Sequence, residues 1–284
     1  MSEAYALPAI SYFLSLNQIT HMHSFEGKTA LVTGASSGIG IEFALQLAAR
    51  GAVPILVARR EARMKQLAEA IYEKCGVEAP VIPADLTAPN AVSELKEAVN
   101  ARELSVDILI NNAGFGFQGE FEGADEQTYI TMCTLNVTAL TALTRAFLPG
   151  MKANGGGILN VSSMAGIAPI PYFSVYAATK AYVCNFGSAL WHEMKEAGGN
   201  VHVSTLCPGP VETEFFEVAG ANPKDVPARE IQQADEVARI GLKALLSNKM
   251  MVPTSPSLKL MQKTAALVPS KLGMSAAAAM MKKK

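Results

Sequence analysis

Acidic side chains are missing from the C-terminal part of this 284-residue chain, because no Asp or Glu follows Glu236. Nine of the 24 Lys and Arg residues do follow it, so the preceding part carries 15 basic and 25 acidic side chains. A body with that net negative charge lacks the positive field that attracts a nucleic-acid backbone. We therefore expect no nucleic-acid partner.

Cysteine and histidine are scarce, with four residues of each. The cysteines form no C-x-x-C pair, and the histidines are dispersed without the spacing of metal ligands. This pattern excludes a disulfide scaffold and argues against a zinc site. We expect free thiols in a cytoplasmic protein, and no bound metal.

Positive charge is absent from the first 25 residues, where a secretory signal would need it. Two long uncharged stretches, Gln127–Thr144 and Ala153–Thr179, are interrupted by Thr, Asn, Ser and Pro, so neither predicts a membrane-spanning helix. Half of the residues are hydrophobic and only 17% are charged, which excludes a disordered chain.

Short apolar runs alternate with amphipathic stretches along most of the chain. A strand that reads as a nearly continuous apolar run is typical of a parallel sheet covered on both faces. The sequence therefore predicts an α/β protein, a single-domain Rossmann fold with a doubly wound parallel sheet. The predicted strands are Thr29–Thr33, Val53–Ala58, Val81–Ala84, Val106–Ile110, Gly157–Val161 and Val201–Leu206, and the predicted helices are Ile41–Arg50, Arg60–Lys74, Asn90–Ala101, Gln127–Lys152 and Ser174–Glu196.

A Gly-rich turn separates the first predicted strand from the first predicted helix, with the spacing Gly34-x-x-x-Gly38-x-Gly40. Such a turn places backbone N–H groups and a helix N-terminus at one point, where they can bind a pyrophosphate. Dinucleotide-binding folds usually carry an acid about 20 residues later that holds the ribose 2′-hydroxyl. Here Arg59 and Arg60 occupy that place, and a guanidinium pairs with phosphate. This favours NADP(H) over NAD(H), with Glu61 as the alternative ribose ligand.

Tyr176 and Lys180 are four residues apart in a predicted helix, so both side chains can face one cleft. A phenol ionises near pH 10, and lowering its pKa to about 7 requires roughly 4 kcal/mol. One positive charge about 4 Å away supplies about 4 kcal/mol at an effective dielectric constant near 20. A single lysine is therefore of the right size to activate this tyrosine as an acid–base group.

Six motifs together resemble the short-chain dehydrogenase/reductases of the non-extended type over about residues 25–250. They are TGASSGIG at Thr33–Gly40, NNAG at Asn111–Gly114, Asn136, Ser162-Ser163, Tyr176-x-x-x-Lys180 and Pro208-Gly209, in the family's order and spacing. The resemblance implies a Rossmann fold and hydride transfer between NAD(P)(H) and a carbonyl or alcohol, and Arg59 and Arg60 favour NADP(H) within it.

The resemblance also implies a role for each matching residue. Tyr176 would be the general acid–base, Lys180 would lower its pKa and bind the nicotinamide ribose, and Asn136 would hold a helix and a relay water. Ser163, 13 residues before the tyrosine, would hydrogen-bond the substrate oxygen. The implied cofactor-binding residues are Gly34, Ser36, Ser37, Gly38, Ile39, Gly40, Arg59, Arg60, Asp85, Leu86, Asn112, Ala113, Gly114, Tyr176, Lys180, Pro208, Gly209, Val211 and Thr213.

Apolar and aromatic residues surround the expected reaction site, among them Phe115, Phe117, Phe173, Phe215 and Phe216. This favours a small lipophilic carbonyl or alcohol as substrate, and an NADP-dependent carbonyl reductase as the function. The alternative is an NADP(H)-binding sensor or partner-binding protein, which would be expected to lack Tyr176 or Lys180. An extended-type epimerase or dehydratase fits less well, because the T-G-x-x-G-x-x-G spacing is absent.

Three segments are expected: an N-terminal extension at 1–24, the catalytic domain at 25–250 and a basic, apolar-rich tail at 251–284. The stretch Gln127–Thr144 is an uncharged helix that can form a helix-pair interface with Ser174–Glu196, which predicts a homodimer or homotetramer. The tail residues Ser257–Lys284 carry six lysines among apolar residues. They are expected either to pack on the body or a neighbouring subunit, or to make peripheral contact with an anionic membrane.

Overall fold

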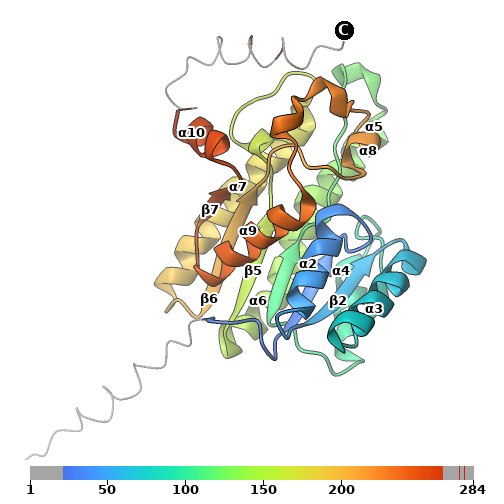
Figure 1. Ribbon diagram of the computed structural model, residues 1–284, viewed down its shortest axis with the longest axis vertical. Coiled ribbons are helices and arrows are strands. Elements are labelled where there is room, and N and C mark those ends of the chain that lie inside the picture. The colour runs from blue at the N-terminus through green and yellow to red at the C-terminus, as the bar shows by residue number, and fades with distance from the viewer. Residues whose placement is uncertain (1–21, 265–274, 276–277, 279–284) are drawn as a thin grey trace, which may run out of the picture.

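A seven-stranded parallel sheet forms the centre of the molecule in the computed structural model, which describes residues 22–264, Ser275 and Ala278 (Figure 1). Its strand order is β3-β2-β1-β4-β5-β6-β7, and every neighbouring pair is parallel. The strands are β1 (Thr29–Thr33), β2 (Val53–Ala58), β3 (Val81–Pro83), β4 (Ile108–Asn111), β5 (Gly156–Val161), β6 (Val201–Cys207) and β7 (Met251–Pro253).

Helices cover both faces of this sheet. Side chains of α2, α3 and α9 belong to one buried apolar cluster, and those of α4, α6 and α7 belong to the other. The helix bounds are α2 (Gly38–Ala48), α3 (Glu61–Cys75), α4 (Ala91–Asn100), α5 (Glu126–Cys133), α6 (Leu140–Asn154), α7 (Ser174–Glu196), α8 (Phe215–Val218), α9 (Ala234–Leu246) and α10 (Pro256–Thr264). Within the described residues, none of these helices has the length and apolarity needed to cross a bilayer.

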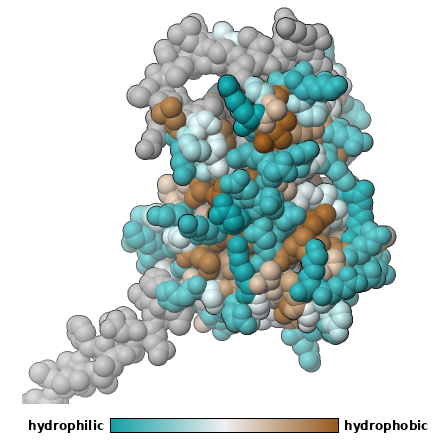
Figure 2. Space-filling view, in the orientation of Figure 1, coloured by the Kyte–Doolittle hydropathy of each residue, from teal (hydrophilic) through white to brown (hydrophobic). Residues whose placement is uncertain are grey.

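The two-sided burial explains the continuous apolar runs. Leu31 of β1 packs into the cluster under α4, α6 and α7, whereas its neighbour Val32 packs into the cluster under α2, α3 and α9. Successive strand residues point to opposite faces, so both must be apolar when both faces are covered. On the face shown in Figure 2, hydrophilic side chains cover most of the outer surface. The predicted doubly wound Rossmann architecture is thereby confirmed.

The strand order reverses beside β1, whose neighbours are β2 on one side and β4 on the other. Open α/β sheets bind ligands in the crevice outside the carboxyl ends of the strands at such a point. The loops that follow β1 and β4 begin at Gly34 and Asn112, which are predicted cofactor residues. The topology therefore brings two of the sequence motifs to one edge of the sheet.

The predicted helix Gln127–Lys152 is not continuous. A wider π-helical turn, Thr134–Ala139, separates α5 from α6 and contains Asn136. Such turns occur often at functional sites, and no periodic pattern of apolar residues marks them in a sequence. The short strand β7 was not predicted from the sequence either.

The structure describes only part of the two predicted end segments, 1–24 and 251–284. Most of the N-terminal extension lies outside the described residues, but its Met22 is buried in the core, as is Phe25 at the start of the catalytic domain. Within the predicted tail, β7 pairs with β6 and so continues the main sheet. Leu258 of α10 packs beside Cys184 and Cys207, and the tail beyond Thr264 is outside the described residues except Ser275 and Ala278.

Candidate active site

A cavity of about 740 Å³ lies at the carboxyl edge of the sheet, and it extends from the Gly-rich turn to Tyr176. Most of the predicted site residues line it. These are Gly34, Ser36, Ser37, Gly38, Ile39, Arg59, Arg60, Asp85, Leu86, Asn112, Ala113, Gly114, Ser163, Tyr176, Lys180, Pro208, Gly209, Val211 and Thr213. The structure thus brings together motifs from all parts of the chain, and it leaves Gly40 and Asn136 behind the cavity wall.

The Gly-rich turn requires glycine at specific points. Gly34 and Gly38 have φ values of +68° and +53°, a region that residues other than glycine rarely adopt. A Cβ at Gly40 would lie 2.2 Å from the carbonyl oxygen of Gly34. The helix that follows begins without a side-chain cap on its N–H groups and without an acid in its first turn. These features leave the N-terminus of α2 suited to an anion.

Thr33 connects the ends of β1 and β4. Its hydroxyl donates to the Ile110 carbonyl and accepts from the backbone N–H groups of Asn112 and Ala113, each at 3.0 Å. The Asn112 side chain donates back to the Thr33 carbonyl at 2.9 Å. These bonds fix the predicted Asn112–Gly114 segment beside the Gly-rich turn.

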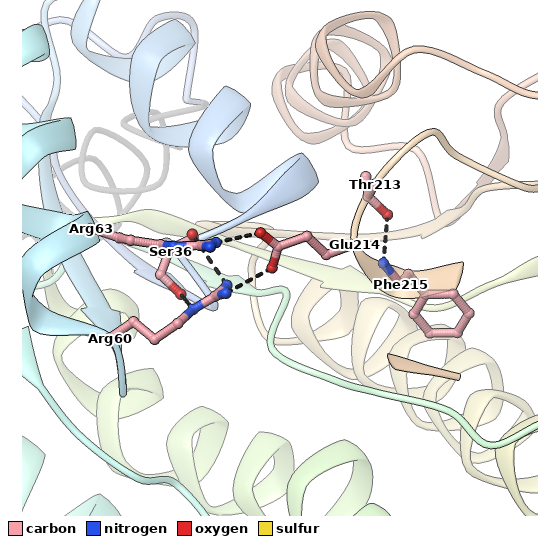
Figure 3. Close-up of polar contacts among 6 residues, drawn as sticks. All are labelled: Ser36, Arg60, Arg63, Thr213, Glu214 and Phe215. Carbon is pink, nitrogen blue, oxygen red and sulfur yellow. Dashed lines mark hydrogen bonds and ion pairs between the residues drawn. The ribbon is translucent and has the colours of Figure 1, made fainter. Parts of the chain in front are cut away.

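Arg60 lies at the start of α3 and bridges two other parts of the cavity wall (Figure 3). Its Nε donates to the Ser36 hydroxyl at 3.1 Å, and Nη2 donates to the Ser36 carbonyl at 3.3 Å. Its Nη1 pairs with Glu214 Oε2 at 2.7 Å, and Arg63 pairs with the other oxygen of that carboxylate. Hydrogen bonds from both arginines lower the pKa of Glu214.

Arg59 and Asp85 line the same end of the cavity. Asp85 Oδ1 accepts from the backbone N–H and the hydroxyl of Thr87, and these bonds lower the pKa of Asp85. The positive charge of Arg59 contributes to the same lowering. The carboxylate therefore stays ionised near the Arg59 guanidinium group.

Tyr176 and Lys180 lie at the opposite end, on one face of α7, and are only 7% and 5% exposed. The Lys180 Nζ donates to the Val161 carbonyl at 2.9 Å and lies 5.7 Å from the centre of the Tyr176 ring. Burial lowers the pKa of Lys180 to about 8, while the neighbouring Cys184 and Cys207 thiols act in the opposite direction. Tyr176 and Lys180 therefore share one face of α7, as the sequence predicted.

The expected effect of Lys180 on Tyr176 does not appear in this cavity. Burial raises the pKa of Tyr176 to about 12, and the group that opposes this rise is the hydrogen-bonded Ser163. The ammonium is directed to Val161, and burial disfavours its own charged form. A charged lysine about 4 Å away would lower the pKa of the phenol, but burial removes water from the phenol and raises its pKa, and burial is the larger effect here.

The two adjacent serines have different surroundings. Ser163 hydrogen-bonds Tyr176 and accepts from the Ala165 backbone N–H at 3.1 Å. The Ser162 hydroxyl instead donates to the Lys180 carbonyl at 2.7 Å. The geometry therefore places Ser163, as the spacing predicted, beside the tyrosine.

Asn136 connects three segments from its place in the π-helical turn. Its side-chain nitrogen donates to the Phe115 carbonyl and to the Thr179 hydroxyl, and its oxygen accepts from the Phe115 N–H. A Cβ at Gly114 would lie 2.9 Å from that oxygen and 3.3 Å from Lys180 Nζ. Asn136 thus holds the loop after β4 close to the lysine.

Aromatic rings form the wall around Tyr176. The ring centres of Phe173 and Phe215 lie 4.7 and 5.3 Å from that of Tyr176. Phe215 belongs to residues 211–231, which we call the lid segment because many of them line the cavity. The sequence identified these aromatic residues, but it did not reveal the pairing of Glu214 with Arg60, since the two are 154 positions apart. In the part of the chain that the structure describes, no three His, Cys, Asp or Glu residues are grouped as metal ligands.

Comparisons with known proteins agree with this geometry. The family model for short chain dehydrogenase matches residues 28–224. The very-long-chain 3-oxoacyl-CoA reductase of Bos taurus is 33% identical over 197 residues, which are 68% of this chain and 62% of that protein. This chain thus spans less than two thirds of the length of the bovine relative.

Two solved structures resemble this protein over most of its chain. A short-chain dehydrogenase from Sphingobium yanoikuyae in complex with NADPH has a TM-score of 0.76 at 33% identity, covering 88% of this chain and 95% of that one. The bulky-bulky ketone specific alcohol dehydrogenase from Comamonas testosteroni has a TM-score of 0.72 at 30% identity, covering 84% and 92%. From its motifs, its fold and these matches, this chain belongs to the short-chain dehydrogenase family.

Proposed function

We propose that this protein is an NADP(H)-dependent oxidoreductase that reduces a lipophilic ketone or aldehyde. The observation that carries the proposal is the layout of the cavity. One end joins an uncapped helix N-terminus to Arg59 and Arg60, and the other end holds Tyr176, Ser163 and Lys180. A dinucleotide is the kind of molecule that can extend from an anion site to a buried proton donor.

The residues present fit a phosphorylated dinucleotide. The turn from Gly34 to Gly40 would bind the pyrophosphate, Arg59 and Arg60 the 2′-phosphate, and Asp85 and Leu86 the adenine. Asn112, Ala113 and Gly114 would contact the adenosine side, and Lys180 the second ribose. Pro208, Gly209, Val211 and Thr213 would hold the nicotinamide end. When bound, NADPH supplies the hydride.

Tyr176 would donate a proton to the carbonyl oxygen of the substrate. The phenol keeps its proton at neutral pH, because its pKa is raised to about 12, so it begins in the form that reduction requires. Ser163 would donate a hydrogen bond to the same oxygen as negative charge develops there. Lys180 and Asn136 would hold the loop after β4 and the tyrosine in position. Positive charge on Lys180 would stabilise the Tyr176 phenolate that proton transfer leaves behind.

The side chains of the cavity wall support an apolar substrate. Aromatic side chains suit an apolar body, and the relative from Comamonas testosteroni is named for bulky ketones. Two carboxylates of the lid segment, Asp225 and Glu230, also line the cavity and form no ion pair among the described residues, whereas Lys224 and Arg229 do not line it. That negative charge disfavours a polyanionic substrate. We therefore favour a neutral ketone over a 3-oxoacyl-CoA, the substrate in the bovine relative's name.

A sensor or partner-binding protein remains the alternative. Such a protein has no need of a proton donor, yet Tyr176 and Lys180 are both present and both buried at the cavity end. Lys180 would bind the second ribose in a sensor as well, so the group that distinguishes the two functions is the buried phenol of Tyr176, which Ser163 hydrogen-bonds. This favours the enzyme.

Calorimetric titration with NADPH and NADH, followed by rate measurements on a carbonyl panel, tests the proposal. We expect NADPH to bind about 10- to 100-fold more tightly, as charge-assisted hydrogen bonds to a phosphate would give. Arg59→Asp should reverse the preference, whereas Arg102→Ala, an exposed arginine in the turn after α4, should leave it unchanged. The panel should turn over bulky ketones faster than 3-oxoacyl-CoA. Equal affinity of the native protein for both cofactors would overturn the cofactor assignment.

A further inference from the structure

Glu214 pairs with the guanidinium group of Arg60, which the proposed function assigns to binding the 2′-phosphate of NADP(H). Arg60 Nη1 donates to Glu214 Oε2, while the rest of the Arg60 guanidinium donates to Ser36 in the Gly-rich turn (Figure 3). Arg63 pairs with the other oxygen of Glu214. We call these three residues the arginine–glutamate bridge.

The bridge joins two parts of the cavity that have different tasks. Arg60 and Arg63 belong to the start of α3, at the anion end, whereas Glu214 belongs to the lid segment. The next residue, Phe215, contacts the Tyr176 ring, and its backbone N–H donates to the Thr213 hydroxyl at 3.2 Å. Thr213 in turn lies against the Gly-rich turn, since a Cβ at Gly38 would meet its methyl group at 2.8 Å. The bridge therefore fastens the lid segment across the cavity.

We propose that Glu214 is a specificity-determining residue that competes with the cofactor's 2′-phosphate for Arg60, so that binding of this phosphate loosens the lid segment. The inference rests on the proposed function. A carboxylate and a phosphate are both acceptors for a guanidinium group, and two anions held close to one guanidinium repel each other. The phosphate carries the greater charge, and the bridge is solvent-exposed, with Arg60 and Glu214 at 42% and 40% exposure. An exposed ion pair is weak and is readily exchanged.

The competition has a consequence for discrimination between cofactors. The 2′-phosphate of NADPH meets the Glu214 carboxylate at Arg60 and is repelled by it, whereas NADH, which lacks this phosphate, leaves the bridge intact. Removing the carboxylate of Glu214 should therefore strengthen the preference for the phosphorylated cofactor. A weak surface pair corresponds to a change of about two- to fivefold.

The test uses 2′,5′-ADP and 5′-ADP, which differ in the 2′-phosphate and lack the nicotinamide. Their dissociation constants are measured by calorimetry for the native protein, Glu214→Gln, Glu214→Asp and Glu217→Gln. Glu217 lies on the same lid segment and forms no ion pair among the described residues, so it controls for charge alone. We expect the ratio of the two constants to shift toward 2′,5′-ADP in Glu214→Gln, partly in the shorter Glu214→Asp, and not in Glu217→Gln.

Hydrogen exchange of the peptide that contains residues 213–221 gives a second readout. In the native protein 2′,5′-ADP should accelerate this exchange and 5′-ADP should not, and Glu214→Gln should exchange fast without either. An unchanged ratio in Glu214→Gln, with a native protein that prefers 2′,5′-ADP, would overturn the competition and leave the cofactor assignment standing. No preference for 2′,5′-ADP in any variant would overturn both.

Discussion

Lys180 is the residue whose placement carries the greatest electrostatic cost in the site. Its ammonium is buried and has one hydrogen bond to a carbonyl, that of Val161, and its pKa is lowered to about 8. A helix surface would offer the same side chain full hydration. The unfavourable burial of this ammonium group is explained by its use at the reacting end of the cavity, next to Tyr176.

Replacing Lys180 by Met should stabilise the protein at neutral pH. The folded-state pKa is lowered, so the unfolded chain binds more protons between pH 8 and 10.5, and native stability rises with pH across that window. Below pH 8 the native protein carries the full cost, on the order of 3 kcal/mol, which the variant avoids. Urea unfolding at pH 7 and pH 9.5 should show the variant's advantage shrinking as pH rises. A constant difference would contradict the lowered pKa.

Residue identities in the site were predictable because they form motifs with fixed spacing. Tyr176 and Lys180, for example, are separated by one helical turn, and α7 begins and ends at the predicted residues. The pKa of Tyr176 was not predictable, since it depends on how completely the surrounding segments bury the phenol. The same holds for the Arg60–Glu214 pair, which only the folded arrangement of α3 and the lid segment brings together.

At the scale of elements, close packing of α7 on β6 fixes the end of the cavity that holds Tyr176. Gly187 of α7 allows this approach, because a Cβ there would lie 2.0 Å from the Thr205 hydroxyl of β6. Strands β1 and β2 were predictable from their continuous apolar runs. The π-helical turn around Asn136 was not, because the contacts that hold it come from Phe115 and Thr179.

Gly187→Ala should destabilise the protein even though alanine favours a helix. The added methyl group must push Thr205 or separate α7 from β6, at a cost of about 1–3 kcal/mol, as in other overpacked cores. Gly150→Ala is the matched control: it lies in α6, is exposed, and nothing lies within 4 Å of its added Cβ. That variant should gain up to about 1 kcal/mol. Thermal unfolding of both variants checks the contrast, and equal effects would contradict the packing argument.

At the scale of the whole molecule, the uncharged outer face of α7 supports the proposal of a homo-oligomer. Ala178, Tyr182, Asn185 and Ala189 are exposed along it, and the Tyr182 hydroxyl lies 2.9 Å from that of Thr141. Membrane contact through the tail remains a proposal too, because most of Ser257–Lys284 lies outside the described residues.

Tyr182→Asp should dissociate this oligomer into chains of 30.0 kDa. A charge buried at an interface without a partner is strongly unfavourable. Tyr72→Asp, on the exposed side of α3 at 58% exposure, should leave the mass unchanged. Light scattering at micromolar concentration measures both variants, and a native protein that is monomeric would contradict the proposal.

The central claim is that Tyr176 donates the proton in an NADPH-dependent reduction. Oxidation of NADPH with a bulky ketone, followed by absorbance in the native protein and in Tyr176→Phe, tests it most directly, with calorimetric NADPH binding as the control. If Tyr176 is the proton donor, its replacement should lower the rate about 10²- to 10⁴-fold and leave binding of NADPH nearly unchanged. A Tyr176→Phe protein that keeps more than about a tenth of the native rate would contradict this role, since general acids typically contribute about 10²- to 10⁴-fold.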